Sequence, residues 1–146
     1  YLANAFGLSG ELLGHDGLRA LGREYAERAL RQQRPDGSFE MNPPLDAIYQ
    51  SVILWNLSWY SLRFPGPRWD EALVRGGAWQ MNRVRADGVV FMADPQGPLK
   101  RLHPDQWDAF AVSWALLYHG VRFDPAALDR ALMVRAKREA LGITRR

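Results

Sequence analysis

The chain has 146 residues, a length typical of one domain with its own hydrophobic core. A hydrophobic content of 47% and a charged content of 24% exclude a disordered chain, and the net charge of +3 is mild. The sequence has no cysteine, which excludes a disulfide framework and a thiolate metal site. No signal peptide or membrane span is visible, and both a cytoplasmic and a secreted location stay open.

Proline residues and Asp-Gly pairs divide the chain into predicted helices. Pro67 and Pro125 each stand where a helical pattern begins, which suits the first helical position because proline has no N–H to donate. Asp36-Gly37 and Asp87-Gly88 mark turns, and a short extended piece is expected at Val89–Met92. We expect helices over residues 2–13, 17–33, 45–63, 67–84, 104–119 and 125–140.

These helices are of two kinds that alternate along the chain. Residues 47–62 and 109–118 are apolar on nearly every side, which is typical of a buried helix. Residues 17–33 and 69–83 have one apolar stripe and one charged face, which is typical of a helix that covers a core. The inner helices begin with similar tripeptides, Asn4-Ala5-Phe6, Asp46-Ala47-Ile48 and Asp108-Ala109-Phe110. The pattern therefore predicts one all-α domain of three repeated hairpins over residues 1–146.

One turn resembles the repeat motif of a known superfamily. Gln33-Arg34-Pro35-Asp36-Gly37-Ser38-Phe39 is similar to the Q-x-x-D-G-S-W repeat of the α/α toroids. These include terpenoid cyclases and prenyltransferase-like proteins, and similar turns occur in six-hairpin glycosidases and polysaccharide lyases. In a degraded second copy, Gln80 lies seven residues before Asp87.

The resemblance implies that the inner helices line a central cavity and that the motif itself has a structural role. Three hairpins are too few to close a ring. The resemblance therefore implies either a fragment of a larger toroid with hairpins missing upstream, or a homodimer that completes the cavity. An open arc of helices is the third possibility.

The inner helices of a toroid run in the same direction, so Asn4, Asp46 and Asp108 are expected at one mouth of the cavity. Two carboxylates across a sugar catalyse glycoside hydrolysis, and neighbouring helices are about 8–10 Å apart, which suits an inverting mechanism. Asp46 and Asp108 are the candidate catalytic pair of a glycan hydrolase. The alternative for each is a helix-start role, because helix N-termini stabilise carboxylates.

Other residues near this mouth are candidates for substrate contacts. Tyr49 and Trp107 offer aromatic surfaces on which a sugar ring can stack. A polysaccharide lyase needs a base and a cation that neutralises a uronate carboxylate, and His103, Tyr49 and Arg101 are the candidates. Gln50 is polar on an apolar helix and is expected to face a wet cavity or to bond across helices. The remaining inner aromatic residues are expected in the core: Trp55, Trp59, Tyr60, Trp114 and Tyr118.

No cofactor is predicted. His103, Asp105 and Asp108 do not have the spacing of a reliable metal motif. The basic residues near the C-terminus indicate a solvated helix face, because no aromatic residue lies among them, and no nucleic-acid or membrane partner is expected. The expected partner is a carbohydrate or another small molecule.

Two further functions stay open. One is a terpenoid-cyclase-like or prenyl-binding toroid, although the acidic D-x-D-D motif of the cyclases is absent from the sequence. The other is a non-catalytic helical module for interaction or scaffolding. A polar open cleft lined by carboxylates favours glycans, a sealed apolar cavity favours isoprenoids, and the lack of a cleft favours the scaffold.

Overall fold

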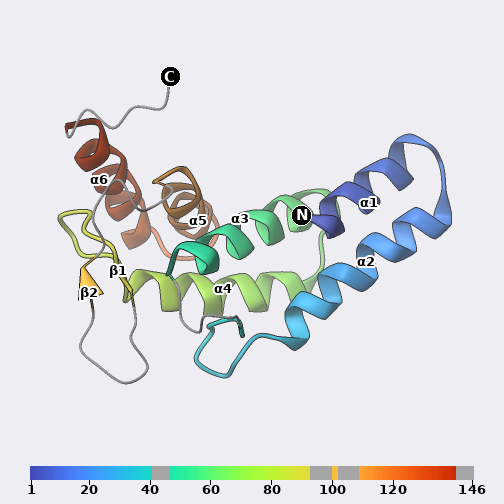
Figure 1. The fold of residues 1–146 in the computed structure, drawn as a ribbon, viewed down its shortest axis with the longest axis horizontal. Helices are drawn as coiled ribbons and strands as arrows, with labels where there is room; N and C mark the ends of the chain where they lie inside the picture. Colours follow the sequence, from blue (N-terminus) through green and yellow to red (C-terminus); the bar gives the residue numbers. More distant parts are fainter. Residues whose placement is uncertain (41–46, 93–99, 102–108, 141–146) are drawn as a thin grey trace.

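The computed structural model describes residues 1–40, 47–92, 100–101 and 109–140. Within these ranges the chain forms three helical hairpins in sequence order (Figure 1). They are α1 (Leu2–Leu12) with α2 (Asp16–Arg31), α3 (Ala47–Arg63) with α4 (Pro67–Met81), and α5 (Ala109–Arg122) with α6 (Ala126–Ala140). Two short strands, β1 (Phe91–Met92) and β2 (Lys100–Arg101), pair antiparallel. The predicted all-α class and the helical hairpins are confirmed.

Local signals set most helix ends. Pro67 is the first residue of α4, and the Asp124 carboxylate accepts a hydrogen bond from the Ala126 N–H before α6 (3.1 Å). Two ends differ from the prediction. α4 stops at Met81 rather than at residue 84, because the chain turns there to bridge Val84 with Val90. α5 continues to Arg122 rather than stopping at residue 119.

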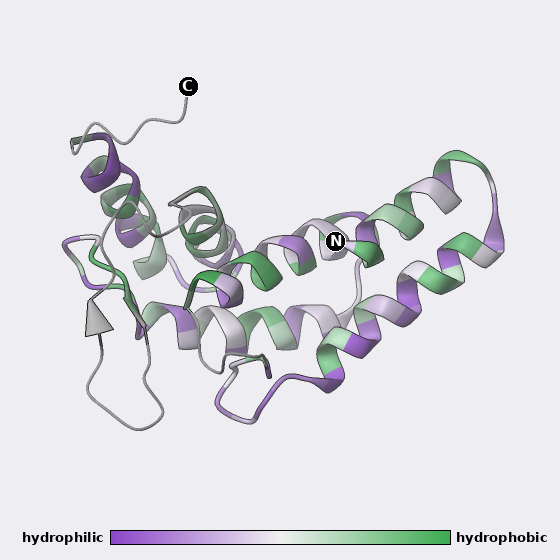
Figure 2. Cartoon of the chain, in the orientation of Figure 1, coloured by the Kyte–Doolittle hydropathy of each residue, from purple (hydrophilic) through white to green (hydrophobic). Residues whose placement is uncertain are grey.

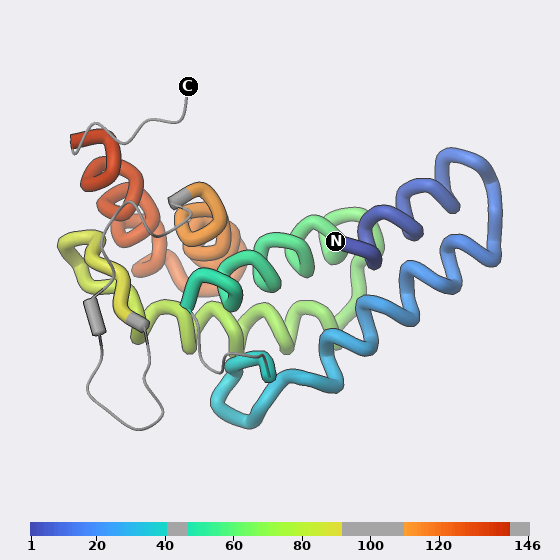
Figure 3. Tube along the Cα trace, viewed as in Figure 1, coloured from blue at the N-terminus to red at the C-terminus, as the bar shows by residue number. Residues whose placement is uncertain are grey.

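α3 lies in the middle of the molecule, between α1 and α5 (Figures 1 and 3). Two polar contacts show that α1 and α3 run in the same direction. The Asn4 amide donates to the Asn56 carbonyl (2.8 Å), and Arg63 pairs with Glu11 about two turns further along both helices. The prediction that the first inner helices are parallel is therefore confirmed.

Aromatic side chains join α3 to α5 in the same parallel sense. The Trp55 and Phe110 rings meet edge to face with centroids 5.2 Å apart, and Trp59 stacks on Trp114 at 5.3 Å. The Trp114 indole N–H also donates to the Ser58 hydroxyl (2.9 Å). Each step of four residues along α3 matches a step of four along α5, so the two helices begin at the same end of the molecule.

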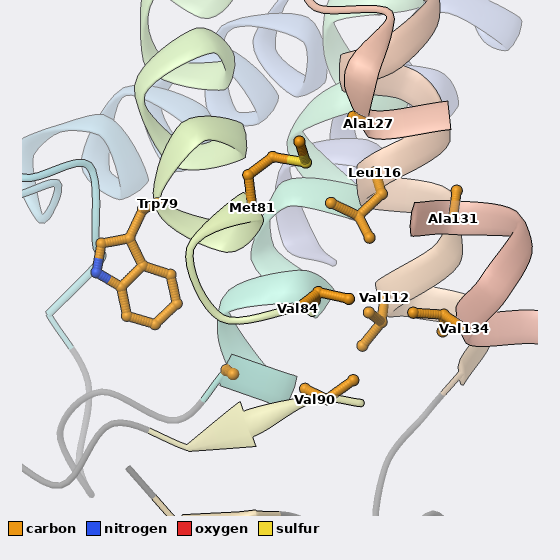
Figure 4. Close-up of a cluster of buried hydrophobic side chains, with 10 residues drawn as sticks. Trp79, Met81, Val84, Val90, Val112, Leu116, Ala127, Ala131 and Val134 are labelled. Carbon is orange, nitrogen blue, oxygen red and sulfur yellow. The ribbon is translucent and has the colours of Figure 1, made fainter. Parts of the chain in front are cut away.

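Two clusters of buried apolar side chains fill the interior of the described chain. One joins the start of α3, α4, the turn after it, α5 and α6, and its side chains are drawn in Figure 4. The other joins the first two hairpins and α5. Close-packed interiors of this kind hold neighbouring helices in fixed positions. The larger members of the first cluster are Trp79, Met81, Val84, Val90, Val112, Leu116 and Val134.

The Q-x-x-D-G-S-F turn clamps α2 to α4. The Gln33 amide donates to the Ala72 carbonyl of α4 (2.8 Å) and to the Gly37 carbonyl (3.1 Å). Gly37 has a φ of +92°, and a side chain there would come within 2.2 Å of the Arg75 carbonyl oxygen. The Asp36 carboxylate accepts from the N–H and the hydroxyl of Ser38. The motif therefore has the structural role that the resemblance implies.

The second turn repeats this backbone but not its side chains. Val84 is bridged to Val90 as Gln33 is bridged to Phe39. Gly88 packs against the backbone of α6, as Gly37 packs against α4. Val84 therefore takes the place of Gln33. Gln80, seven residues before Asp87, lies fully buried within α4.

The apolar helices α3 and α5 are enclosed on part of their surface only. Hydropathy colouring shows apolar positions along both helices (Figure 2). Trp59 is 48% exposed and Val121 70% exposed, whereas Tyr60 and Tyr118 are buried. The prediction that Trp59 belongs to the core is therefore wrong. Hydrophobic composition shows that a helix favours burial, but it does not show whether a neighbour covers each side.

Candidate functional site

An open groove of about 430 Å³ lies among α1, α2 and α3. A volume of this size is within the usual range of small-molecule sites. Its floor and walls are mostly apolar, and none of the described side chains that line it is charged. We call this feature the tyrosine groove, and it is lined by Tyr1, Leu2, Ala3, Tyr25, Ala26, Ala29, Tyr49, Val52, Ile53, Asn56, Leu57 and Tyr60.

The relative placement of α1 and α3 creates the tyrosine groove. α1 begins level with the middle of α3, where the Tyr1 ring meets Trp55 edge to face at 6.4 Å. The first turns of α3 consequently border open space rather than α1. Tyr49 and Val52 lie on this part of α3, and Tyr25 of α2 closes the opposite wall.

The polar atoms of the groove come from one amide and four phenols. The Asn56 side chain donates to the Val52 carbonyl (2.8 Å) and receives a longer contact from the Asn4 amide (3.5 Å). Burial raises the pKa of Tyr60, against the opposing charge of Arg23. The phenol of Tyr60 therefore stays neutral at physiological pH. The groove thus offers neutral hydrogen-bonding groups around an apolar floor.

Two of the sequence-predicted residues belong to this region. Tyr49, predicted as a stacking surface, lines the groove and is 57% exposed. Asn4, predicted at the mouth of a cavity, lies behind the wall, where its amide bonds to Asn56. The structure therefore brings Tyr49 and the Asn4–Asn56 pair to one site.

Gln50 is buried, so it is not placed to contact a substrate in the groove. Its side chain is 1% exposed. Its amide nitrogen donates to the Gly37 carbonyl (3.1 Å), and its oxygen accepts from the Phe39 N–H (2.9 Å). Gln50 thus ties the start of α3 to the motif turn. Of the two roles expected for it, bonding to another part of the fold is the one observed.

The proposed catalytic residues are not placed by the structure. Asp46, His103 and Asp108 lie outside the described residues, as does Trp107. For Arg101 only the backbone, in β2, is described. The glycan-processing site therefore stays a prediction from the sequence.

Tyr25 and Tyr60 are groove residues that the sequence did not single out as ligand contacts. Tyr25 belongs to the apolar stripe of its helix, and Tyr60 was expected in the core. Both have the pattern of ordinary packing residues, so periodicity alone does not separate them from a core. The phenol itself is the available signal, because a tyrosine at an apolar position places a hydroxyl where phenylalanine would place none.

No group of three or more His, Asp or Glu side chains in the described ranges is placed to hold a metal ion. No helix in the described part of the chain is long and apolar enough to cross a membrane.

Comparisons with protein-family models, with curated proteins and with solved structures gave no match.

Proposed function

We propose that this chain is a ligand-binding helical-hairpin domain and that the tyrosine groove takes an apolar small molecule of the isoprenoid class. The observation that carries the proposal is the lining itself, an apolar floor with neutral phenols and one amide. Each Å² of apolar surface removed from water stabilises a complex by roughly 25 cal/mol, before the costs of association are subtracted. An extended hydrocarbon uses this surface fully.

The polar groups of the groove are few and partly engaged. The Asn56 amide already donates to a backbone carbonyl and contacts Asn4. A sugar ring has several hydroxyl groups that lose water on binding and need new partners. A ligand with a single hydroxyl or carbonyl group at one end matches the groove better, because a phenol of Tyr1 or Tyr25 is sufficient for it.

The parallel inner helices support a toroid-like arrangement for this site. α1, α3 and α5 lie side by side in that order, and each is followed by the second helix of its hairpin. We infer that the three hairpins form an arc of the α/α-toroid kind. The groove then lies on the boundary between the first and second hairpins, where two repeats meet.

A groove-filling substitution tests the proposal. Val52→Trp places an indole in the groove, and Val74→Trp adds the same ring to α4, at a position 41% exposed and away from the groove. Farnesol and geranylgeraniol are the probes, with cellohexaose as the comparison ligand, and binding is measured by calorimetry. We expect the native protein and Val74→Trp to bind the isoprenoids, and Val52→Trp to bind them at least about tenfold more weakly.

The contrary results are equally clear. Equal isoprenoid affinity in Val52→Trp and Val74→Trp would place the ligand elsewhere. Binding of cellohexaose without binding of either isoprenoid would reject the ligand class and favour a glycan.

Glycan hydrolysis is the second candidate, and one observation favours it. Because α3 and α5 are parallel, their first residues, Ala47 and Ala109, lie at the same end of the molecule. Asp46 and Asp108 precede these residues in the sequence. Asp108→Asn would abolish turnover of a polysaccharide while leaving the melting temperature unchanged. Unchanged turnover, or loss of the fold, would remove Asp108 from the mechanism.

A further inference from the structure

Two cavities lie along the interface between α2 and α3, and Tyr60 lines both of them. The first is the tyrosine groove, which follows α3 from Tyr49 to Tyr60. The second has a volume of about 510 Å³ and lies between charged residues of α2 and the Phe64 ring that follows α3. Among the described lining residues, Tyr60 is the one that the two cavities share. It therefore stands between two open spaces in the same interface.

The side chain of Tyr60 spans this interface. It is 3% exposed, although it borders both cavities. Its ring meets Trp69 of α4 edge to face, with the centroids 5.3 Å apart. Burial raises the pKa of its phenol, and the nearby guanidinium of Arg23 opposes that shift, so the hydroxyl end reaches α2. Tyr60 thus connects α3 to α2.

The interface between α4 and α5 is the equivalent contact between the second and third hairpins. Phe64 directly follows α3, and Phe123 directly follows α5. Each donates its backbone N–H to the carbonyl of the residue four positions earlier, at 2.8 Å. These carbonyls belong to Tyr60 and His119, which are therefore equivalent residues of the two interfaces.

The turns align α2 with α4 in the same way. Both turns have a glycine of positive φ, Gly37 and Gly88. Gly37 lies as many residues from the start of α2 as Gly88 lies from the start of α4. In this alignment Ala26 of α2 corresponds to Gly77 of α4. The pair Ala26 and Tyr60 in one interface thus takes the place of Gly77 and His119 in the other.

The interface with the smaller pair is the closer one. The backbones of α4 and α5 pack more closely than those of α2 and α3. Gly77 leaves no room for even a methyl group, which would come within 2.1 Å of the Nδ1 atom of His119. In the other interface, Ala26 adds that methyl group and Tyr60 has the longer ring, and both are buried in one cluster. Both also line the tyrosine groove.

We propose that Tyr60 is the residue that keeps the tyrosine groove open: with Ala26, it sets the separation of α2 from α3 and so determines whether an isoprenoid chain enters. Tyr60 is a positioning residue in this role, because it holds the walls of the groove apart. Packed helices lie about 8–10 Å apart, depending on the side chains at the contact, so a change of pair moves α2 by about 2 Å. The identity of the ligand rests on the isoprenoid proposal, but the separation of the helices does not.

A double variant with a distance measurement tests this role. The chain has no cysteine, so two introduced cysteines carry spin labels at chosen sites. Glu24→Cys and Leu62→Cys, both at exposed positions, report the separation of α2 from α3 by electron paramagnetic resonance. Ala26→Gly with Tyr60→His should shorten that distance by about 2 Å. It should also weaken binding of farnesol and geranylgeraniol at least about tenfold. Tyr60→Phe keeps the ring and should retain both the distance and the affinity.

The reciprocal double variant tests the same relationship between α4 and α5. Gly77→Ala with His119→Tyr, labelled at Val74→Cys and Val121→Cys, should lengthen the distance by about 2 Å. This arm decides the question if the first double variant does not fold. An unchanged distance in a folded double variant would overturn the role of Tyr60 as a spacer. A shorter distance between α2 and α3 with unchanged isoprenoid affinity would show that the spacing does not control the groove. If the distances change as expected and the native chain binds neither isoprenoid, the ligand proposal fails and the spacing role stands.

Discussion

The imidazole of His119 lies directly over Gly77, so close that a methyl group at position 77 would come within 2.1 Å of its Nδ1 atom. Only a residue without a side chain lets α4 approach α5 at this point. His119 is buried, and no hydrogen-bond partner for its Nδ1 atom is found among the described residues. The pair therefore fixes the distance between the second and third hairpins.

Gly77→Ala tests this contact, because the substitution should lower the free energy of unfolding here, whereas it raises it at an ordinary helical site. At an exposed helical site, the change from glycine to alanine stabilises by up to about 1 kcal/mol. At position 77 we expect it to lower the free energy of unfolding by about 1–3 kcal/mol, because the ring of His119 has to move. Urea denaturation measures the difference, and a stabilised Gly77→Ala would show that the contact is not rigid.

The same histidine predicts a pH dependence. Burial lowers the pKa of His119 below its ordinary value of 6.5, with Asp124 and the Leu73 carbonyl opposing that shift. The unfolded chain consequently binds the proton more readily than the folded chain. The contribution of His119 to stability is complete above pH 6.5 and is lost as the pH falls below that value toward the lower folded pKa.

Melting temperatures of the native chain and His119→Gln, measured across this window, isolate that contribution. The difference between the two curves should change below pH 6.5 and stay constant above it. Parallel curves for the native chain and His119→Gln would contradict the prediction.

Alanine substitutions at Gly37 and Gly14 separate the effect of backbone conformation on stability from the effect of packing. Both have positive φ, +92° and +63°, which disfavours any L side chain by about 1–2 kcal/mol. A methyl at Gly14 meets nothing within 4 Å, whereas one at Gly37 meets the Arg75 carbonyl at 2.2 Å. Gly37→Ala should cost about 1–3 kcal/mol more than Gly14→Ala in chemical denaturation. Equal costs would mean that the turn does not clamp α4.

Gln80 predicts a stabilising substitution. Its side chain is fully buried, and neither amide atom has a hydrogen-bond partner among the described residues. A buried polar group without a partner costs about 1–3 kcal/mol, and an apolar side chain of similar shape removes that cost. Gln80→Met should therefore raise the free energy of unfolding by about 1 kcal/mol or more. A destabilised variant would show that the amide is satisfied by a bound water or ligand.

Short-range chemistry in the sequence determined the helices of this protein. Pro67 and Asp124 place the starts of α4 and α6, and the motif turn at Asp36 and Gly37 forms with the conformation that glycine requires. These features depend on residues within a few positions of one another. The sequence therefore sufficed for the all-α class, the hairpins and the structural role of the turn.

Only the tertiary structure decided which surfaces are covered and which residues share a site. Tyr25 and Tyr49, from different hairpins, line one groove. Gln50, next to Tyr49, instead hydrogen-bonds to the backbone of the motif turn. The apolar pattern of α3 indicated burial equally for Trp59 and Tyr60, yet one is half exposed and the other enclosed. Helical periodicity records which residues favour burial, but the direction of each neighbouring helix, set by packing between distant segments, determines where a groove stays open.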